Sequence, residues 1–382
     1  MATKRGLILL MAALLLNTSG IMNLAQAETQ LPSPDMSIPV YYNPNGGKNF
    51  HGDQRCRSVN KRYLPLSQLT LANLYAAPYN ALTPCPYCSP PPKPHIPVNT
   101  GGLAAIGIGI SDLSQAGAQL PGTIPLTAEY AILYDLSAGQ ILCEKNATQR
   151  CEPASLTKLL SVLTAYVNGG ENIQYTVGRE ITLVGSNSST AYLRKGNVLS
   201  FNAIVDAVLL PSGNDAAYTL AVNVARYVEG KKLSDEDALS VFADLMNETA
   251  YALGCSDSHF VSVDGYPNSD HYSTAYDMLR IAIAAASTPV IVKSVIKSRA
   301  YHVFISNREV IWETTNLLLN HDSGFYYQYA TGMKTGSTGE VYHLAASAQK
   351  DGTSLIAIVL GANSDENRFR EAVALLEYGF GR

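Results

Sequence analysis

Strand-like apolar runs lie at both ends of the last two thirds of the chain. Residues 129–147 contain two such runs joined by a Ser-Ala-Gly turn, which is typical of a β-hairpin. Similar runs occupy residues 299–305, 343–350 and 354–362, and a closing helix is expected over residues 365–380. Because strands come from both ends, we predict an α+β domain whose sheet unites its two termini.

Helical periodicity dominates the sequence between these runs. It predicts a helix over residues 154–167 and two helices within residues 200–228 that meet near Pro211. A further amphipathic helix is expected over residues 235–254, where a glycine ends it. We therefore expect an antiparallel sheet with a cluster of helices beside it.

Proline and glycine divide the chain into parts. Residues 89–97 are rich in proline and predict a stiff, extended spacer. The Gly/Ala-rich stretch that follows has no charge pattern that would commit it to a helix. We expect a small module at residues 38–90, a linker at residues 91–124 and a large domain at residues 125–382.

The first 27 residues have the features of a secretory signal peptide. Lys4 and Arg5 precede an apolar run over residues 6–16, and residues 25–27 read Ala-Gln-Ala, a pattern that signal peptidase accepts. The run is about half of the ~20 residues that a membrane-spanning helix needs. We expect cleavage after residue 27 and a secreted or extracytoplasmic protein.

Composition changes this picture in two ways. Removal of the signal would leave 25 basic and 31 acidic residues, and this mildly acidic balance argues against nucleic acid as a partner. Export would also place the six cysteines outside the reducing cytosol, where disulfides or metal binding are available to them.

Ser155 and Lys158 are three residues apart at the start of the predicted helix 154–167. Residues with this spacing share one helix face, so the hydroxyl and the amine would project into the same space. A serine hydroxyl is a poor nucleophile until a base takes its proton, and a lysine can be that base when burial lowers its pKa. Alone the pattern is weak, because Ser-x-x-Lys also begins at Ser58 and Ser294.

Two further motifs follow Ser155 in order. Residues 212–214 read Ser-Gly-Asn, and residues 334–336 read Lys-Thr-Gly, which occurs once in the chain. Ser-x-x-Lys, Ser-x-Asn and Lys-Thr-Gly in this order are the signature of penicillin-binding proteins and serine β-lactamases. The pair at Ser294 comes after Ser-Gly-Asn, and the pair at Ser58 lies in the small module, so neither fits the order.

Together with the surrounding sequence, these motifs resemble the catalytic domain of the D-alanyl-D-alanine carboxypeptidases, the low-molecular-mass penicillin-binding proteins. The resemblance covers about residues 125–381, including the stretches HFVSVDGYPNSDHYSTAYDM and NRFREAVALLEYGF. It implies a β-lactamase/transpeptidase-like fold and removal of the terminal D-alanine from peptidoglycan stem pentapeptides. It also implies acylation by β-lactam antibiotics and catalysis without a cofactor.

The resemblance implies a role for each residue of the first two motifs. Ser155 would attack the carbonyl between the two D-alanines, with Lys158 as its general base. Ser212 would relay a proton to the leaving D-alanine. Asn214 would hold Lys158 and the amide of the substrate.

The third motif would face them from an edge strand. Lys334 would supply positive potential, and the hydroxyl of Thr335 would bind the free carboxylate of the substrate. Gly336 would leave room for the substrate to pair with the strand. The backbone N–H groups of Ser155 and Ser337 would form the oxyanion hole.

Some positions depart from the family pattern. Ser337 stands where some relatives have histidine, and the stretch EVYH, with His343, replaces an Ala-Gly and a cysteine that often follow the motif. These changes bear on rate and substrate preference. Many relatives continue into a β-rich domain and an anchoring helix, whereas this sequence stops at Arg382. We therefore expect no C-terminal membrane anchor, and a Gram-positive source.

The small module carries His51, Cys56, Cys85 and Cys88. One nitrogen and three sulfur ligands, two of them in a Cys-x-x-Cys pair, suit a structural zinc site, and about fifty residues can bury little core without such a staple. Disulfides are the competing interpretation in an exported protein, and a redox-active pair is a third. No sequence feature identifies what the module binds.

The other three cysteines lie in the large domain. Cys143 and Cys151 flank a short polar stretch, and they could form a disulfide or be two small core residues. Cys255 has no evident partner and is expected to be a buried thiol.

The same motifs are compatible with functions other than that of a carboxypeptidase. A D,D-endopeptidase or a β-lactamase would use the same nucleophile, although class A β-lactamases usually have Ser-Asp-Asn at the second motif. A wall-binding or penicillin-sensing protein would keep the fold without turnover. The intact motifs favour catalysis.

Overall fold

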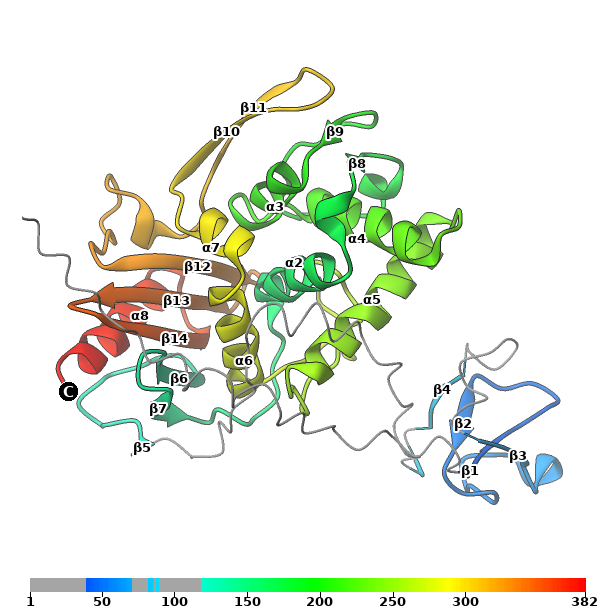
Figure 1. Cartoon of the computed structure of the whole chain (residues 1–382). Coiled ribbons are helices and arrows are strands. Elements are labelled where there is room, and N and C mark those ends of the chain that lie inside the picture. The colour runs from blue at the N-terminus through cyan, green and yellow to red at the C-terminus, as the bar shows by residue number, and fades with distance from the viewer. Residues whose placement is uncertain (1–38, 71–81, 86, 89–117) are drawn as a thin grey trace, which may run out of the picture. The chain divides into compact units, whose positions relative to one another are not determined.

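The structure is a computed structural model that describes residues 39–70, 82–85, 87–88 and 118–382. The chain divides into two compact units, Met1–His95 and Ile96–Arg382 (Figure 1). The predicted signal peptide and most of the predicted linker lie outside the described residues. The described parts of the two units are called the module and the body below.

The module is built on a small sheet with the strand order β3-β1-β2-β4. Strand β1 pairs antiparallel with β2 and β3, and β4 is parallel to β2. Its apolar core is small, because Val40 and Phe50 are fully buried with Leu69 and Leu82 packed against them. The elements of the module are β1 (Pro39–Tyr42), β2 (Asn49–His51), η1 (Lys61–Tyr63), β3 (Ser67–Thr70) and β4 (Thr83–Pro84).

The body contains a six-stranded sheet with the order β12-β13-β14-β6-β7-β5. Its strands are β5 (Ala118–Gln119), β6 (Tyr130–Asp135), β7 (Gln140–Lys145), β12 (Ala330–Ser337), β13 (Tyr342–Lys350) and β14 (Thr353–Ala362). Strand β14 pairs with β6, which joins the two ends of the domain as predicted. The predicted run at 299–305 belongs to a separate two-stranded sheet of β10 (Arg299–Val303) and β11 (Glu309–Glu313).

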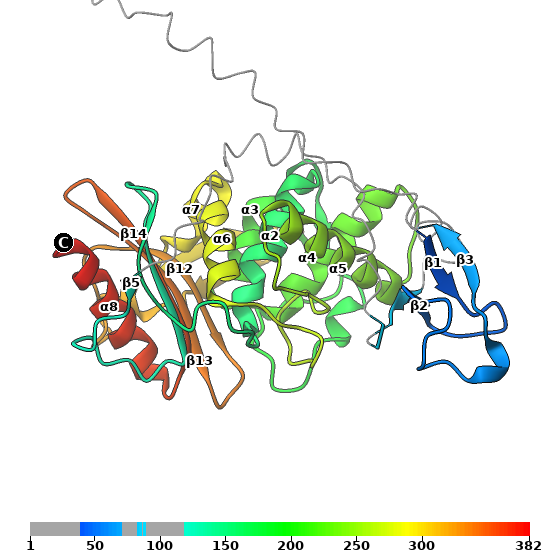
Figure 2. The ribbon, with the colours of Figure 1, turned by 90° about the horizontal axis from the view of Figure 1, so that it is seen from below.

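Helices cover both faces of this sheet, so the body has the α+β architecture that the sequence predicts. Helix α8 (Asp365–Phe380) lies on one face, and the other helices lie on the opposite face (Figure 2). These are α2 (Thr157–Val167), α3 (Phe201–Leu209), α4 (Asn214–Glu229), α5 (Asp235–Ala252), α6 (Ala275–Ala286) and α7 (Pro289–Val295). Shorter elements are η3 (Ala154–Leu156), η4 (Gly170–Asn172), β8 (Tyr175–Thr176), η5 (Glu180–Thr182), β9 (Val198–Leu199) and η6 (Leu317–Leu319).

Alternation along the strands supplies a core to each face of the sheet. Ile132 packs with the helical cluster, whereas its neighbour Leu133 packs with α8. The same alternation separates Ile358 from Val359 on β14. Because successive side chains of a strand point to opposite faces, one apolar strand serves both cores.

Polar residues mark where the helices begin and end. The hydroxyl of Ser234 accepts from the backbone N–H of Asp237 at the start of α5, and that of Ser364 does the same for Asn367 at the start of α8. Gly254, with a φ of +80°, follows the end of α5 as predicted.

No helix in the described part of the chain is individually long and apolar enough to span a membrane. Helices α6 and α7 together, bent by 99°, meet that test by length and composition.

Candidate active site

Ser155 lies in η3, which runs directly into α2. The residue before it, Ala154, has a φ of +47°, so the chain enters the helix through a left-handed turn. Gly265 packs behind this turn, and a Cβ atom at that position would lie 1.9 Å from the carbonyl oxygen of Ala154. A glycine is therefore required at 265, and its close approach fixes the backbone that carries Ser155.

Lys158 contacts Ser155 as the three-residue spacing predicts. Its Nζ lies 2.7 Å from the Oγ of Ser155 and donates a second hydrogen bond, of 2.9 Å, to the main-chain oxygen of Asp264. The side chain is completely buried. Burial lowers the pKa of Lys158 to about 8, against the opposing effect of the Asp264 and Asp215 carboxylates. Near this pH much of the amine is neutral and able to accept a proton from the hydroxyl.

A buried histidine holds the segment that presents the Asp264 carbonyl to Lys158. Nδ1 of His271 accepts from the backbone N–H groups of Val261 and Ser262, each at 3.2 Å. The proton of the neutral ring is therefore on Nε2, which donates to the hydroxyl of Thr157 at 2.9 Å. Burial lowers the pKa of His271 to about 4, so the ring is neutral at ordinary pH.

Ser212 and Asn214 lie where α3 gives way to α4, and both side chains are nearly buried. Ser212 has a φ of +58°. Nδ2 of Asn214 donates to the hydroxyl of Ser188 at 2.8 Å, while its buried Oδ1 has no hydrogen-bond partner. The expected hydrogen bond between Asn214 and Lys158 is not formed here, and among the described residues none joins Ser212 to Ser155 or Lys158.

Asp215 is a residue of the site that the sequence analysis missed. Its carboxylate accepts from the backbone N–H groups of Ala191 and Leu193, at 2.7 and 2.8 Å. The backbone N–H of Asn214 donates to the carbonyl of Ser189 at 2.8 Å. Asp215 thus ties a loop against the Ser-Gly-Asn turn. An acidic residue in the first turn of a predicted helix was the available signal.

The Lys-Thr-Gly motif lies on β12, an edge strand of the main sheet. Lys334 is almost completely buried, and its Nζ donates to the carbonyl of Thr335 at 2.8 Å. Burial lowers the pKa of Lys334, and the positive charges of Lys158 and Arg368 lower it further. The hydroxyl of Thr335 lies 2.5 Å from that of Thr315. Two buried amines therefore share the site, and the charge of Lys158 disfavours that of Lys334.

Gly336 brings β12 against the turn that carries Ser155. A Cβ atom at Gly336 would lie 3.3 Å from the backbone nitrogen of Ser155. The carbonyls of Gly336 and His343 accept from the guanidinium of Arg368, at 2.9 and 3.3 Å. Arg368, which lies on α8, was also missed by the sequence analysis. Ser337 follows Gly336 and is exposed.

The cysteines of the body are free thiols in the structure. Cys143 lies in the core beneath α8, whereas Cys151 packs against the core of the helical face, so the disulfide that the sequence left open is not formed. Burial raises the pKa of the Cys143 thiol to about 11. Cys255 is buried, as predicted, with its sulfur 3.5 Å from the carbonyl of Asp277.

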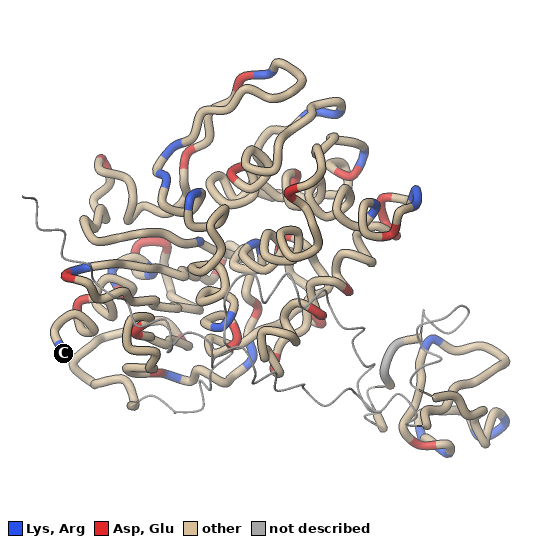
Figure 3. Tube along the Cα trace, viewed as in Figure 1, with Lys and Arg blue, Asp and Glu red and all other residues tan. Residues whose placement is uncertain are grey.

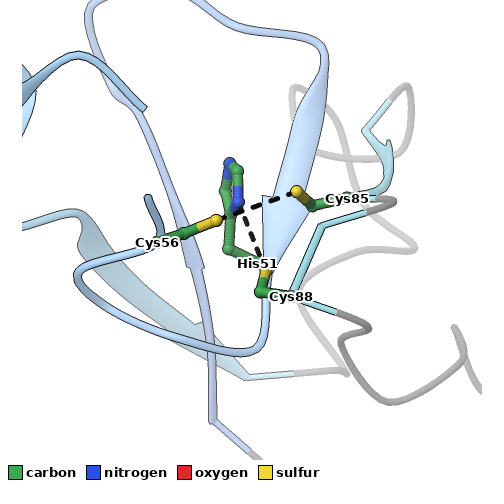
Figure 4. A group of neighbouring side chains, drawn as sticks. All are labelled: His51, Cys56, Cys85 and Cys88. Carbon is green, nitrogen blue, oxygen red and sulfur yellow. Dashed lines mark hydrogen bonds between the residues drawn. The ribbon is translucent and has the colours of Figure 1, made fainter. Parts of the chain in front are cut away.

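In the module, the four candidate metal ligands converge (Figure 4). His51 ends β2, Cys56 lies in the turn that follows, and Cys85 and Cys88 come after β4. Their ligand atoms all lie within 4.8 Å of one another. The sulfurs of Cys56 and Cys85 are 3.9 Å apart, and Nδ1 of His51 is 3.6 Å from the sulfur of Cys88.

These separations fit a tetrahedral zinc ion. Zinc–sulfur and zinc–nitrogen bonds of about 2.3 and 2.05 Å place two sulfurs about 3.8 Å apart and a sulfur and a nitrogen about 3.6 Å apart. Hydrogen-bond donors also surround the sulfurs, since the hydroxyl of Ser58 lies 3.1 Å from Cys56 and the backbone N–H of Tyr87 donates to Cys85 at 3.5 Å. The cluster is compatible with a structural zinc site.

Comparison with known families decides the class of the body. Residues 115–364 match the family model of the D-alanyl-D-alanine carboxypeptidases, peptidase family S11. The chain belongs to this family. Members of the family act without a cofactor.

Individual proteins that are similar to this chain support its assignment to the carboxypeptidase family. The chain is 33% identical to D-alanyl-D-alanine carboxypeptidase DacC of Escherichia coli (strain K12), over 65% of this chain and 60% of that protein. It is 30% identical to the D-alanyl-D-alanine carboxypeptidase of Streptomyces sp. (strain K15), over 74% of this chain and 96% of that protein. The chain thus spans about three fifths of the length of the E. coli relative and nearly all of the Streptomyces one.

Solved structures show the same fold. The crystal structure of the Streptomyces K15 DD-transpeptidase has a TM-score of 0.61 and 27% identity, and the match covers 68% of this chain and 98% of that one. Penicillin-binding protein D2 from Listeria monocytogenes, in its cefotaxime-bound form, has a TM-score of 0.55 and 27% identity over 67% of this chain and 98% of that one. The family member therefore has the transpeptidase-like fold that its motifs imply.

Proposed function

We propose that the chain is a serine-type D-alanyl-D-alanine carboxypeptidase that removes the terminal D-alanine from peptidoglycan stem pentapeptides. The observation that carries the proposal is the 2.7 Å contact between Ser155 Oγ and the buried Nζ of Lys158, in a chain of this family. A neutral amine at this distance is positioned to take the hydroxyl proton as the oxygen attacks a carbonyl carbon.

The acylation step follows from this pair. Lys158 takes the proton of Ser155, whose oxygen forms a bond to the carbonyl carbon between the two D-alanines. The negative charge that develops on the carbonyl oxygen is stabilised by the backbone N–H groups of Ser155 and Ser337. The support is that a Cβ atom at Gly336, the residue before Ser337, would lie 3.3 Å from the Ser155 nitrogen.

The remaining motif residues bind the substrate and guide the proton to the leaving group. Ser212 passes the proton taken up by Lys158 to the nitrogen of the departing D-alanine as the bond between that nitrogen and the carbonyl carbon breaks. The free Oδ1 of Asn214 accepts a hydrogen bond from the substrate amide. Thr335 binds the terminal carboxylate, and Lys334 adds positive potential beside it. Water then hydrolyses the acyl-enzyme, which restores Ser155 and releases the shortened stem peptide.

Transfer of the acyl group to an amine is a second candidate reaction. The Streptomyces K15 protein, which is similar over nearly its whole length, is named both a carboxypeptidase and a DD-transpeptidase. Hydrolysis and transfer share the acyl-enzyme on Ser155 and differ in what accepts the acyl group. Acylation of this chain by β-lactams is also proposed, by similarity to the cefotaxime-bound Listeria protein.

The proposal extends to the other parts of the chain. Residues 1–27 are a signal peptide for export to the wall or periplasmic space, residues 91–124 are a linker, and residues 125–382 are the catalytic domain. In the module at residues 38–90, His51 and the three cysteines hold one structural zinc ion, for which the 3.9 and 3.6 Å separations are the support.

The test is the release of D-alanine from a stem pentapeptide that ends in D-alanyl-D-alanine. The mature protein is compared with Ser155→Ala and with Ser240→Ala, a control at an exposed serine of α5. We expect release by the mature protein and by the control, and none by Ser155→Ala. Addition of an amine such as glycine separates hydrolysis from transfer. Release that survives in Ser155→Ala contradicts the proposal.

A further inference from the structure

A loop of the module presents a concentrated positive charge. Residues 54–66 contain Arg55, Arg57, Lys61 and Arg62 and no acidic residue. All four side chains are exposed, and among the described residues none forms an ion pair. We call this segment the basic loop.

The basic loop is closed and anchored at both ends. The backbone N–H of Leu66 donates to the carbonyl of Gln54 at 3.0 Å, and the side-chain amide of Gln54 donates to the carbonyl of Leu66 at 3.2 Å. Leu66 is buried, and Cys56 points into the ligand cluster. Hydrogen bonds and buried side chains therefore hold the backbone that carries the four cations, beside the cluster of candidate metal ligands.

Two of the four cationic side chains lie in a short 3-10 helix. Lys61 and Arg62 belong to η1, whose start is capped by the side chain of Asn60. The guanidinium of Arg62 lies 4.5 Å from the centre of the Tyr63 ring. This packing restricts Arg62, whose Nη2 donates to the hydroxyl of Tyr63, and the other donors of its exposed guanidinium face the surface.

The charge of the module contrasts with that of the body. Residues 39–95 contain six basic residues and one acidic residue, whereas residues 96–382 contain 19 basic and 28 acidic residues. Figure 3 shows mainly blue segments on the module and an interspersed pattern of red and blue on the body. A single exposed cation binds weakly in water, but four on one loop bind a partner that offers several anions at once.

We propose that the basic loop binds an anionic polymer of the bacterial envelope that carries repeating phosphate groups. Three of the four cations are arginines, whose planar guanidinium matches phosphate oxygens in a bidentate way. A repeating polyanion supplies many such groups and releases bound counterions on binding. The envelope location rests on the proposed export, and the binding is independent of Ser155 chemistry.

The test is retention of the full mature chain on purified cell walls, at about 50 and 300 mM salt. The walls are used intact or after hydrofluoric acid has removed their phosphodiester-linked polymers, with inorganic polyphosphate as a soluble competitor. The loop variant replaces Arg55, Arg57, Lys61 and Arg62 by Gln. A control variant replaces four exposed lysines of the body, namely Lys195, Lys231, Lys232 and Lys293, by Gln and changes the net charge equally.

We expect the loop variant, acid extraction of the walls or the higher salt each to weaken retention about tenfold or more, and the control variant to weaken it less than twofold. Unchanged metal content and unchanged D-alanine release from a soluble pentapeptide show that the loop variant is folded. Equal retention of the loop variant and the mature protein overturns the proposal. Tighter binding to duplex DNA than to intact walls at equal salt overturns the partner class.

Discussion

The body and the module place their functional side chains by different means. The body surrounds Lys158 with a large apolar core on the helical face of its sheet, and the lysine is completely buried. The module has only a small apolar cluster around Val40 and Phe50 in its described part, yet it gathers His51 and three cysteines within 4.8 Å. Packing positions Lys158, whereas the four side chains of the module are compatible with a shared metal ion.

This difference has a chemical consequence. In the body, burial disfavours the charged form of an amine, so the same packing that holds Lys158 also lowers its pKa to about 8. In the module, the proposed zinc ion would hold three thiolates and an imidazole together, because a small core cannot keep such like charges in contact by packing alone. The body should therefore tolerate loss of the metal, and the module should not.

The largest expected effect is that of metal removal. A chelator, or Cys85→Ser, should remove the proposed zinc ion and with it roughly 10 kcal/mol of binding free energy that would fold the module. The backbone N–H groups of β1 and β2 should then lose their protection from hydrogen exchange. D-alanine release from a soluble pentapeptide should be unchanged. Zinc analysis combined with hydrogen exchange checks this, and a module that stays protected without metal would argue for disulfides instead.

The second effect is the replacement of the base. Lys158→Met should lower kcat/KM for pentapeptide hydrolysis by roughly 10³-fold, because the hydroxyl of Ser155 loses its proton acceptor. Thermal stability of the body should not fall, since a buried charged group is replaced by an apolar one of similar length. Lys232→Met, at an exposed position, is the control and should retain full activity. A loss of less than tenfold at Lys158 would contradict its role.

A third test compares the two cores directly. Phe242 of α5 and Phe50 of β2 are both fully buried. Phe242→Ala should destabilise the body by about 3–5 kcal/mol and leave zinc affinity unchanged. Phe50→Ala should weaken zinc affinity, because folding and metal binding are coupled in the module, and should leave the melting temperature of the body unchanged. Calorimetry and zinc titration check both outcomes. A change in zinc affinity with Phe242→Ala, or in the melting temperature of the body with Phe50→Ala, would instead show that the two units are coupled.

The smallest effect is a pH dependence. Burial lowers the pKa of Lys158 to about 8, and the base must be neutral, so kcat/KM should rise with pH through about 8 and then level. Below that value, activity should fall about tenfold for each pH unit as the amine becomes protonated. Zinc content, measured in parallel, should not follow the same curve above neutral pH. A rate that is flat from pH 6 to 9 would show that Lys158 is not the group that titrates.

Much of the fold could be predicted because it depends on local patterns. The hairpin of β6 and β7, the start of α8 and the end of α5 follow from alternation, caps and a glycine. The contact between Ser155 and Lys158 follows from helix geometry alone. Convergence of the four ligands in the module also agrees with the spacing of a zinc site.

Other features could not be predicted because they depend on contacts between distant segments. The second acceptor of Lys158 is a main-chain carbonyl at Asp264, and a backbone group leaves no mark in the sequence. Arg368 reaches the carbonyl of Gly336 from a helix on the opposite face of the sheet. The hydrogen bond expected from Lys158 to Asn214 is not formed in this structure: the amide nitrogen of Asn214 donates to Ser188, and its amide oxygen has no partner. Side-chain partners of this kind are set by tertiary packing.

The most direct test of the account is the site at which a β-lactam acylates the chain. The mature protein is treated with cefotaxime, digested and analysed by mass spectrometry, with Ser155→Ala treated in parallel. We predict one adduct, on the peptide that contains Ser155, and no adduct on the variant. An adduct on another serine, or on the variant as well, would show that Ser155 is not the nucleophile.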